Sequence, residues 1–250
     1  IPRAFFLTIG LPARDDAWLA GFTKGMTELS RQAGCPLLGG DTTRTAKVGD
    51  IHAPVTISIT AMGELPQSMG LTRSGARPGD DIWVSGCVGG AWAALMHRWG
   101  KLTLDARVFP AAALAMDRPN PRNALGTALL SSATACADIS DGLAQDLGHI
   151  LERSGVDADV LWDAVPKHPQ EQQIEAAMSG GDDYELVFTA PADKRGLIEQ
   201  ASISALTPVT RIGRIVEKKP SGAPLAIRDA SGRPLFLPVQ GFDHFAQSAD

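Results

Sequence analysis

The chain has 250 residues, of which 44% are hydrophobic and 20% charged, and its formal net charge at pH 7 is -5. This composition predicts a folded globular protein with one large domain or two modest ones. The negative charge creates no field that would gather nucleic acid or an anionic membrane, so neither is an expected partner. No apolar run approaches the ~20 residues that a membrane-spanning helix needs.

Cysteine usage indicates a reducing environment. The three cysteines, Cys35, Cys87 and Cys136, lie far apart and form no CxxC pair. An odd number with this spacing argues against a disulfide framework and against a structural zinc site. No secretory signal peptide is recognisable at the first residues, so we expect a cytoplasmic location.

The first part of the chain is predicted to form a strand, helix, strand, strand unit. Asp15 and Asp16 lie in a turn that supplies an N-cap, and Gly34 is expected to end the helix. The expected elements are a buried strand at 4–10, a helix from about 16 to 33, a short strand at 36–40 followed by a polar turn at 41–45, and a strand at 53–63.

A segment rich in Gly, Pro, Ser and Arg, residues 63–78, is predicted to join two domains, 1–66 and 67–250. A proline-bearing loop is expected around 100–120, and the mixture of elements predicts an α+β or α/β fold, not an all-parallel repeat. The expected strands are 81–86, 134–142, 157–162, 184–190, 209–215 and 224–229, and the expected helices are 89–99, 121–133, 143–155, 170–178 and 192–201.

Two polar segments combine residues that suit phosphate and metal binding. The GGDTTR turn, residues 39–44, offers glycines for close backbone approach to a phosphate and Asp41 as a Mg²⁺ ligand. Ordinary turn chemistry explains it equally well. The DISDG turn, residues 138–142, places Asp138, Ser140 and Asp141 near a helix N-terminus, where an anion is favoured. A simple helix cap is the alternative, but a cap needs only one such residue.

A third segment, SGGDDYE at residues 179–185, again places glycines before two carboxylates, Asp182 and Asp183. A solvated acidic loop is the alternative. No GxGxxG, no GxxxxGK[ST] and no Ser-His-Asp or Cys-His relay is legible, and the five histidines show no metal-ligand spacing. Three Gly/Asp turns therefore favour a Mg²⁺ and phosphate site, and phosphoryl transfer depends mainly on positioning and charge neutralisation.

The segments GGDTTR, DISDGLAQDLGHIL, SGGDDYEL and GFDHF, in this order, resemble the thiamine-monophosphate kinase family. The similarity runs from LTIGLP and DDAWL to GFDHF, almost the whole chain. The resemblance implies a two-domain fold like aminoimidazole ribonucleotide synthetase, with an N-terminal α+β domain that pairs in a homodimer and a C-terminal α/β domain. It also implies phosphorylation of thiamine phosphate by ATP to thiamine diphosphate, through direct in-line transfer assisted by several Mg²⁺ ions.

The resemblance assigns roles to particular residues. The implied roles are ATP binding by Gly40, Asp41, Arg73 and Ser140, catalysis and Mg²⁺ binding by Asp41, Asp138 and Asp141, and thiamine phosphate binding by Asp182 and the ring of Phe242.

Two departures from the family pattern matter. The family usually has Glu where this chain has Asp182, so the carboxylate reaches less far. The family's first portion, with a Gly-Asp-Asp turn, a Ser-Thr-Asp segment, a substrate-binding His and a further metal-binding Asp, precedes the residue matched by Ile1. The resemblance thus implies an incomplete N-terminal domain, and we expect these 250 residues alone to bind Mg-ATP weakly and to turn over little.

Two other hypotheses stay open. One keeps the superfamily but changes the reaction, to an ATP-using ring closure or to a selenium or hydrogenase-maturation activity. The other is a non-catalytic nucleotide-binding or dimerisation module descended from the kinase.

Overall fold

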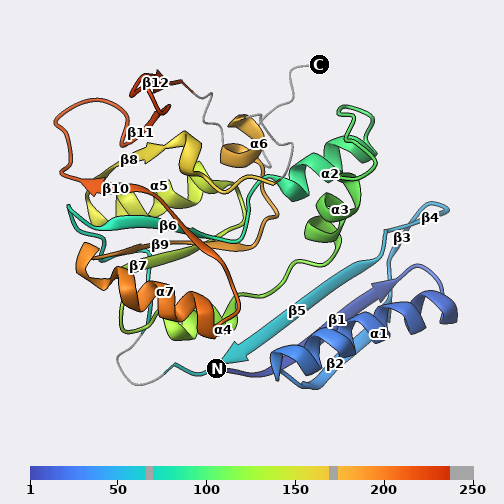
Figure 1. Cartoon of the computed structure of the whole chain (residues 1–250). Coiled ribbons are helices and arrows are strands. Elements are labelled where there is room, and N and C mark those ends of the chain that lie inside the picture. The colour runs from blue at the N-terminus through green and yellow to red at the C-terminus, as the bar shows by residue number, and fades with distance from the viewer. Residues whose placement is uncertain (66–69, 169–173, 237–250) are drawn as a thin grey trace. The chain divides into compact units, whose positions relative to one another are not determined.

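The computed structural model describes residues 1–65, 70–168 and 174–236 (Figure 1). The chain divides into two compact units, Ile1–Ser68 and Met69–Asp250, and each is described by itself.

The first unit is a three-stranded sheet with one long helix. The strand order is β2-β1-β5, with β1 parallel to β2 and antiparallel to β5. The elements are β1 (Pro2–Leu11), α1 (Asp16–Ala33), β2 (Leu37–Arg44), β3 (Lys47–Val48), β4 (Ile51–His52) and β5 (Thr56–Gly63). Helix α1 begins where the Asp15 carboxylate accepts the N–H of Trp18 and ends at Gly34, which has a φ of 61°. The predicted helix boundaries are therefore confirmed.

The first unit buries little apolar surface. Phe5 and Ile9 of β1 are buried, whereas no residue of α1 is. Every residue of β5 is exposed, including Ile59 at 52%. Strand β5 forms one border of this sheet, so its apolar side chains lie uncovered within the unit.

The GGDTTR segment is a strand, not a turn. Strand β2 runs through it, and residues 40–44 pair one by one with residues 7–11 of β1. The prediction of a turn at 41–45 was wrong because a neighbouring strand supplies backbone partners along the whole segment, and its threonines suit a strand. Gly40 has a structural reason to be glycine, since a Cβ there would lie 1.9 Å from the Leu7 carbonyl oxygen.

The second unit is built on a mixed seven-stranded sheet with the order β12-β11-β8-β10-β6-β9-β7. Its strands are β6 (Asp81–Ser85), β7 (Ala135–Ile139), β8 (Asp157–Leu161), β9 (Glu185–Ala190), β10 (Val209–Val216), β11 (Leu225–Arg228) and β12 (Pro234–Leu235). Its helices are α2 (Gly90–Arg98), α3 (Phe109–Asp117), α4 (Asn123–Ala128), α5 (Leu143–Ser154), η1 (Trp162–Ala164), α6 (Ile174–Ser179), η2 (Ala192–Lys194) and α7 (Arg195–Ser204).

Helices cover both faces of this sheet, α5 and α6 on one side and α4 and α7 on the other (Figure 1). Successive strand residues point to opposite faces, so Ile82 and Val84 of β6 join the core beneath α5 while Trp83 joins the core beneath α4 and α7. There Trp83 stacks on its cross-strand partner Phe188, with ring centroids 6.4 Å apart. The mixed α and β architecture predicted from the sequence is confirmed.

Helix α3 and the short strands β3, β4 and β12 were not predicted from the sequence. Helix α3 lies inside the segment that was expected to be a proline-bearing loop. Pro110 is in the first turn of α3, where its missing N–H costs no helical hydrogen bond. The structure confirms a helix at 174–179, and the rest of the helix predicted from residue 170 lies outside the described residues.

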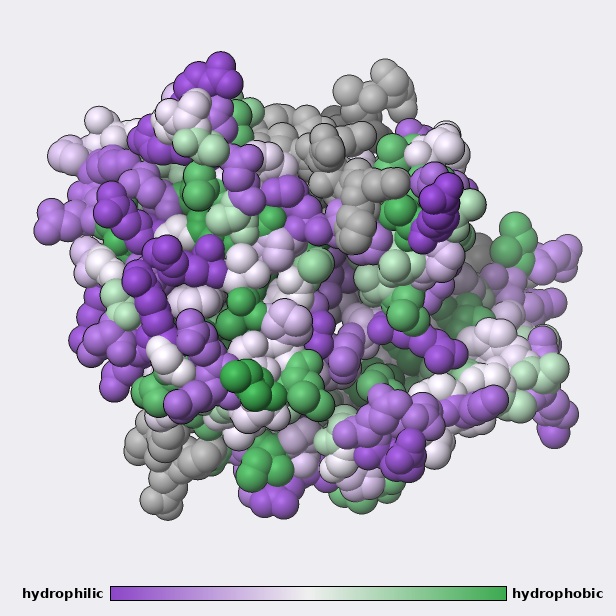
Figure 2. Space-filling model, in the orientation of Figure 1, coloured by the Kyte–Doolittle hydropathy of each residue, from purple (hydrophilic) through white to green (hydrophobic). Residues whose placement is uncertain are grey.

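No helix in the described parts of the chain is both long and apolar enough to cross a bilayer. On the face drawn in Figure 2, hydrophilic and apolar residues are interspersed over the second unit.

Candidate functional site

Two of the predicted polar segments meet at the end of β7, the border strand of the large sheet. The N–H of Tyr184 donates to the carbonyl oxygen of Ile139 over 2.8 Å, and the N–H of Asp182 donates to that of Ser140 over 2.9 Å. The DISDG turn and the SGGDDYE segment, together named the paired turns below, are therefore joined by backbone hydrogen bonds. The sequence predicted both segments but not their direct contact.

Glycine is required where the paired turns touch. A Cβ on Gly181 would lie 2.4 Å from the Ser140 carbonyl oxygen, closer than any real contact. Gly142 has a φ of 115°, and a Cβ there would lie 2.8 Å from Cα of Ser179. These glycines allow the close approach of two backbone segments.

A buried carboxylate supports the DISDG turn from below. Asp146 of α5 is 1% exposed, and its Oδ2 accepts the N–H of Ser140 at 3.0 Å and of Asp141 at 3.1 Å. Burial raises the pKa of Asp146, the two N–H donors oppose this, and the charges of Asp141 and Asp138 add to it. The N-cap of α5 is Gly142 without any side-chain hydrogen bond, so the alternative that Ser140 or Asp141 caps this helix was wrong.

The carboxylates of Asp182 and Asp183 do not act as a pair, because they point to different places. Asp182 Oδ1 accepts the hydroxyl of Tyr184 over 2.9 Å, at the exposed side of the turn. That hydrogen bond raises the pKa of Tyr184, followed by burial and by the charges of Asp182, Asp138 and Asp141. Three of the predicted site carboxylates therefore lie near one phenol.

Asp183 turns inward to the start of α2. Its carboxylate oxygens accept the N–H of Gly89 over 3.0 and 2.9 Å. Burial raises the pKa of Asp183 to about 8; the N–H groups of Gly89 and Ala91 lower it, while the charges of Glu185 and Asp182 raise it further. Asp183 thus anchors the paired turns to a second helix N-terminus.

A buried ion pair completes the far side of the SGGDDYE segment. Arg122 donates through Nε to Glu185 Oε2 over 2.7 Å, and Ser85 Oγ donates to the same oxygen over 2.5 Å. A hollow of about 220 Å³ lies beside these groups. It is lined by Cys87, Ala111, Leu114, Ala115, Arg118, Pro119, Asn120, Arg122, Asp183 and Glu185. Arg122 was not predicted from the sequence, because no local pattern indicates that it pairs with Glu185.

The remaining predicted residues are not part of the paired turns. Gly40 and Asp41 are exposed in β2 of the first unit, with Asp41 opposite Thr8 of β1. Phe242 lies outside the described residues.

Arg73 lies beside β7 but toward its beginning. The carbonyl oxygen of the preceding residue, Thr72, accepts the N–H of Cys136 over 2.9 Å. The carbonyl oxygen of Arg73 itself accepts Ser154 Oγ over 3.3 Å, at the last residue of α5. The paired turns lie at the other end of that helix, so the structure does not bring the Arg73 backbone into them.

The carboxylates at the paired turns suit Mg²⁺ in chemistry, since hard oxygen ligands are what this ion takes. Asp138 and Asp141 supply two such groups, and Asp141 Oδ2 accepts Gln145 Nε2 over 3.3 Å. Across the described ranges, no cluster of three or more His, Cys, Asp or Glu residues could hold a metal by itself. Asp138 and Asp141 therefore do not form a complete metal site among the described residues.

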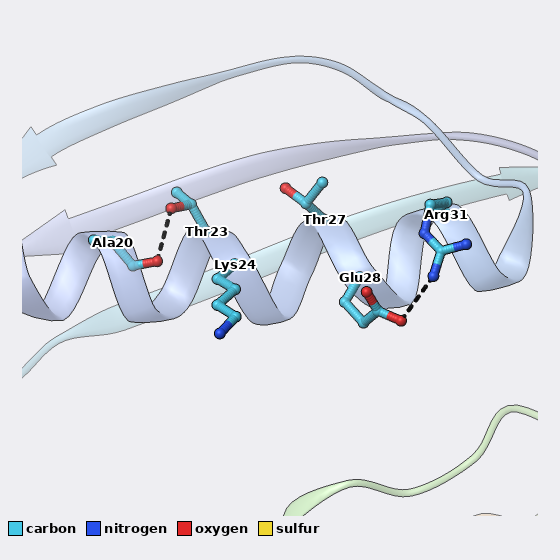
Figure 3. A pocket seen from close by; sticks show the side chains of 6 residues that line it. All are labelled: Ala20, Thr23, Lys24, Thr27, Glu28 and Arg31. Carbon is cyan, nitrogen blue, oxygen red and sulfur yellow. Dashed lines mark hydrogen bonds and ion pairs between the residues drawn. The ribbon is translucent and has the colours of Figure 1, made fainter.

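Another hollow, of about 430 Å³, runs along α1 and is lined by that helix alone (Figure 3). Its side chains come from successive turns, and Arg31 donates to Glu28 over 3.0 Å. None of the predicted site residues lines it, and we regard it as a polar helix face.

Comparison with known proteins shows the family. The thiamine-monophosphate kinase of Haemophilus influenzae is 36% identical over 256 aligned residues, which cover 99% of this chain and 75% of that protein. The chain belongs to the thiamine-monophosphate kinase family. The sequence profiles of the AIR synthase related protein N-terminal and C-terminal domains match residues 1–65 and 77–224.

Solved structures of thiamine-monophosphate kinases have the same fold. That of the enzyme from Stenotrophomonas maltophilia is 37% identical, with a TM-score of 0.80 over 90% of this chain and 72% of that one. The complex of AaThiL with AMPPCP and TMP is 26% identical, with a TM-score of 0.78 over 98% of this chain and 74% of that one. The family resemblance seen in the sequence motifs is thereby confirmed.

Proposed function

We propose that this protein transfers a phosphate from ATP to thiamine phosphate, giving thiamine diphosphate, by direct in-line transfer assisted by Mg²⁺. The observation that carries the proposal is the meeting of two family motifs at the end of β7. Kinship with kinases of this name supports the reaction. A neighbour of the same fold holds AMPPCP, an ATP analogue, together with TMP, which supports the two substrates.

In this proposal the paired turns bind the reacting groups. Asp138 and Asp141 hold Mg²⁺, Ser140 contacts ATP, and Asp182 contacts thiamine phosphate. Bound Mg²⁺ would neutralise charge on the phosphate oxygens. The support is electrostatic: the charges of Asp182, Asp138 and Asp141 all raise the pKa of Tyr184, and bound cations would offset this negative charge.

Residues outside the paired turns complete the assignment. Asp41 is proposed as a further Mg²⁺ and ATP ligand, with Gly40 beside it on the exposed strand β2. Arg73 is proposed to bind ATP through its exposed side chain, and Phe242 to contact thiamine phosphate. A phosphate acceptor is largely ionised at pH 7, because its second pKa is about 6, so the reaction needs no strong general base.

We also propose that the protein is a cytoplasmic homodimer that pairs through its first unit. The exposed apolar residues of β5, among them Ile57 at 42% and Met62 at 49%, support a partner at that border of the sheet. Light scattering of the purified protein should give twice the chain mass. A monomer would remove this part of the proposal and leave the reaction untouched.

The decisive measurement is ADP release from ATP and Mg²⁺, with and without thiamine phosphate, using protein expressed from the complete gene. Thiamine-phosphate-dependent ADP formation, with thiamine diphosphate as product, is the expected result. ADP formation that depends instead on another acceptor would transfer the assignment to a related enzyme of the superfamily. Nucleotide binding without turnover would support a binding module.

A further inference from the structure

Asp146 is a charged group in a place that normally takes an apolar one. It lies on the buried face of α5 with Leu143, Leu147 and Ile150, all fully buried. Burying a carboxylate costs free energy unless hydrogen bonds compensate. Only one of its two oxygens is compensated, since Oδ1 is buried and has no hydrogen-bond partner in the described parts of the chain. A carboxylate at position 146 therefore costs folding free energy that an apolar side chain would not, so packing alone does not explain Asp146.

The compensated oxygen holds one defined piece of backbone. Oδ2 accepts the N–H of Ser140 at 3.0 Å and of Asp141 at 3.1 Å. The peptide group between these residues is also held at its carbonyl oxygen, which accepts the N–H of Asp182 over 2.9 Å. With both polar atoms fixed, this peptide plane cannot rotate, and the directions of the Ser140 and Asp141 side chains are set.

We infer that Asp146 is a positioning residue for the reaction: it fixes the Ser140–Asp141 peptide so that the side chains of these residues face ATP and Mg²⁺. Asp146 itself is screened from solvent and touches neither ligand. The inference deepens the proposed function and rests on it. Partners of this kind typically change metal affinity or activity by about 10- to 100-fold when mutated.

Asp157 provides a matched control. It is a buried aspartate of β8, 4% exposed, and its Oδ2 likewise accepts one backbone N–H, that of Lys219, over 2.9 Å. It follows the C-terminal end of α5, whereas the DISDG turn precedes the N-terminal end of that helix. Asp157→Asn and Asp146→Asn thus make the same chemical change at similarly buried positions. Asp157 lies away from the paired turns, whereas Asp146 contacts the DISDG turn.

The test compares Asp146→Ala, Asp146→Asn and Asp157→Asn with wild type in the protein expressed from its complete gene. Three quantities are measured: kcat with its Mg²⁺ dependence, Mg-AMPPCP affinity by calorimetry, and hydrogen exchange of the Ser140 and Asp141 amides. For Asp146→Ala we expect about 10- to 100-fold lower kcat, a higher Mg²⁺ requirement and faster exchange of both amides. Asp146→Asn keeps an acceptor oxygen and should recover part of the activity. Asp157→Asn should leave all three unchanged.

The outcomes separate the two proposals. If wild type lacks thiamine-phosphate-dependent turnover, the proposed reaction fails, and Mg-AMPPCP affinity then decides about Asp146. Weaker affinity together with faster amide exchange in Asp146→Ala supports the positioning role. Unchanged kcat, Mg²⁺ dependence and nucleotide affinity in folded Asp146→Ala would overturn it. Equal losses in Asp157→Asn would also overturn it, because the effect would then reflect general destabilisation.

Discussion

The backbone N–H of Asp182 donates to the carbonyl oxygen of Ser140 over 2.9 Å, which ties the SGGDDYE segment directly to the DISDG turn. The bond forms only because Gly181 lets the two backbones approach; a Cβ there would lie 2.4 Å from the same oxygen. The contact thus depends on the absence of one carbon atom.

Gly181→Ala should therefore separate the paired turns. We expect a loss of about 1–3 kcal/mol in the free energy of unfolding, as for other overpacked sites, and a kcat lower by about 10- to 100-fold, because small displacements of catalytic groups are costly. Urea unfolding and steady-state kinetics measure the two effects. Gly148→Ala in α5 is the control: a Cβ there has nothing within 4 Å, so it should be neutral or stabilising. Similar behaviour of the two variants would contradict the close-approach argument.

The carboxylates of the DISDG turn should matter for turnover more than for folding. Asp141→Asn and Asp138→Asn remove charge while keeping shape, and single electrostatic contacts in active sites are worth about 10²- to 10³-fold in rate. We expect kcat losses of that order with the thermal midpoint nearly unchanged. Asp193→Asn, at an exposed residue of η2, is the matched control and should keep wild-type kinetics. Wild-type rates in both turn variants would remove these residues from the proposed site.

Removing one partner of the Arg122–Glu185 ion pair should destabilise the fold strongly, whereas replacing both partners by apolar residues should cost less. The side chains of this pair are 17% and 8% exposed, so Arg122→Met leaves a buried carboxylate without its cationic partner, which costs about 3 kcal/mol or more. Urea unfolding should show this loss. The Arg98–Asp117 pair is exposed at 42% and 47%, so Arg98→Met should cost far less. The idea fails if the double variant Arg122→Met with Glu185→Leu is no more stable than Arg122→Met alone.

Asp183 should make stability fall as the pH rises. Its pKa of about 8 lies above the ordinary value of 3.8, so between these values the folded state binds the proton more tightly than the unfolded state does. This contribution is favourable at low pH and is lost as the pH approaches and passes 8. Asp183→Asn stays neutral and keeps an acceptor for the Gly89 N–H. The unfolding free energy of this variant, relative to that of wild type, should therefore increase from pH 5 to pH 8. Urea titrations with parallel pH profiles would contradict this.

Local features of the fold were predictable from the sequence. Asp15 and Gly34 indicated the two ends of α1, and the apolar run Ile82, Trp83 and Val84 predicted a strand, which is buried on both faces. The missed helix α3 shows the limit of this reasoning. A proline was interpreted as a loop signal although it is equally at home in the first turn of a helix.

The site was predictable in its residue types but not in its connections. Asp146 had a signal, a carboxylate in phase with the buried Leu143, Leu147 and Ile150, yet the two N–H groups that it accepts become visible only in the folded chain. The separation of Asp182 from Asp183 had no signal, because Asp183 is directed by Gly89, 94 residues away. Pairings over such distances, like that of β1 with β2 through the GGDTTR segment, are set by tertiary structure.

The same long-range bonds bear on when the site takes shape as the chain is synthesised. Ser85 and Gly89 leave the ribosome first, then the DISDG turn and α5, while their partners Glu185 and Asp183 follow 100 and 94 residues behind the first two. Loops of that length close slowly. Until they close, the DISDG turn next to α5 lacks its backbone hydrogen bonds to the SGGDDYE segment. We therefore expect the nascent second unit to lack a nucleotide site until β9 has joined the sheet.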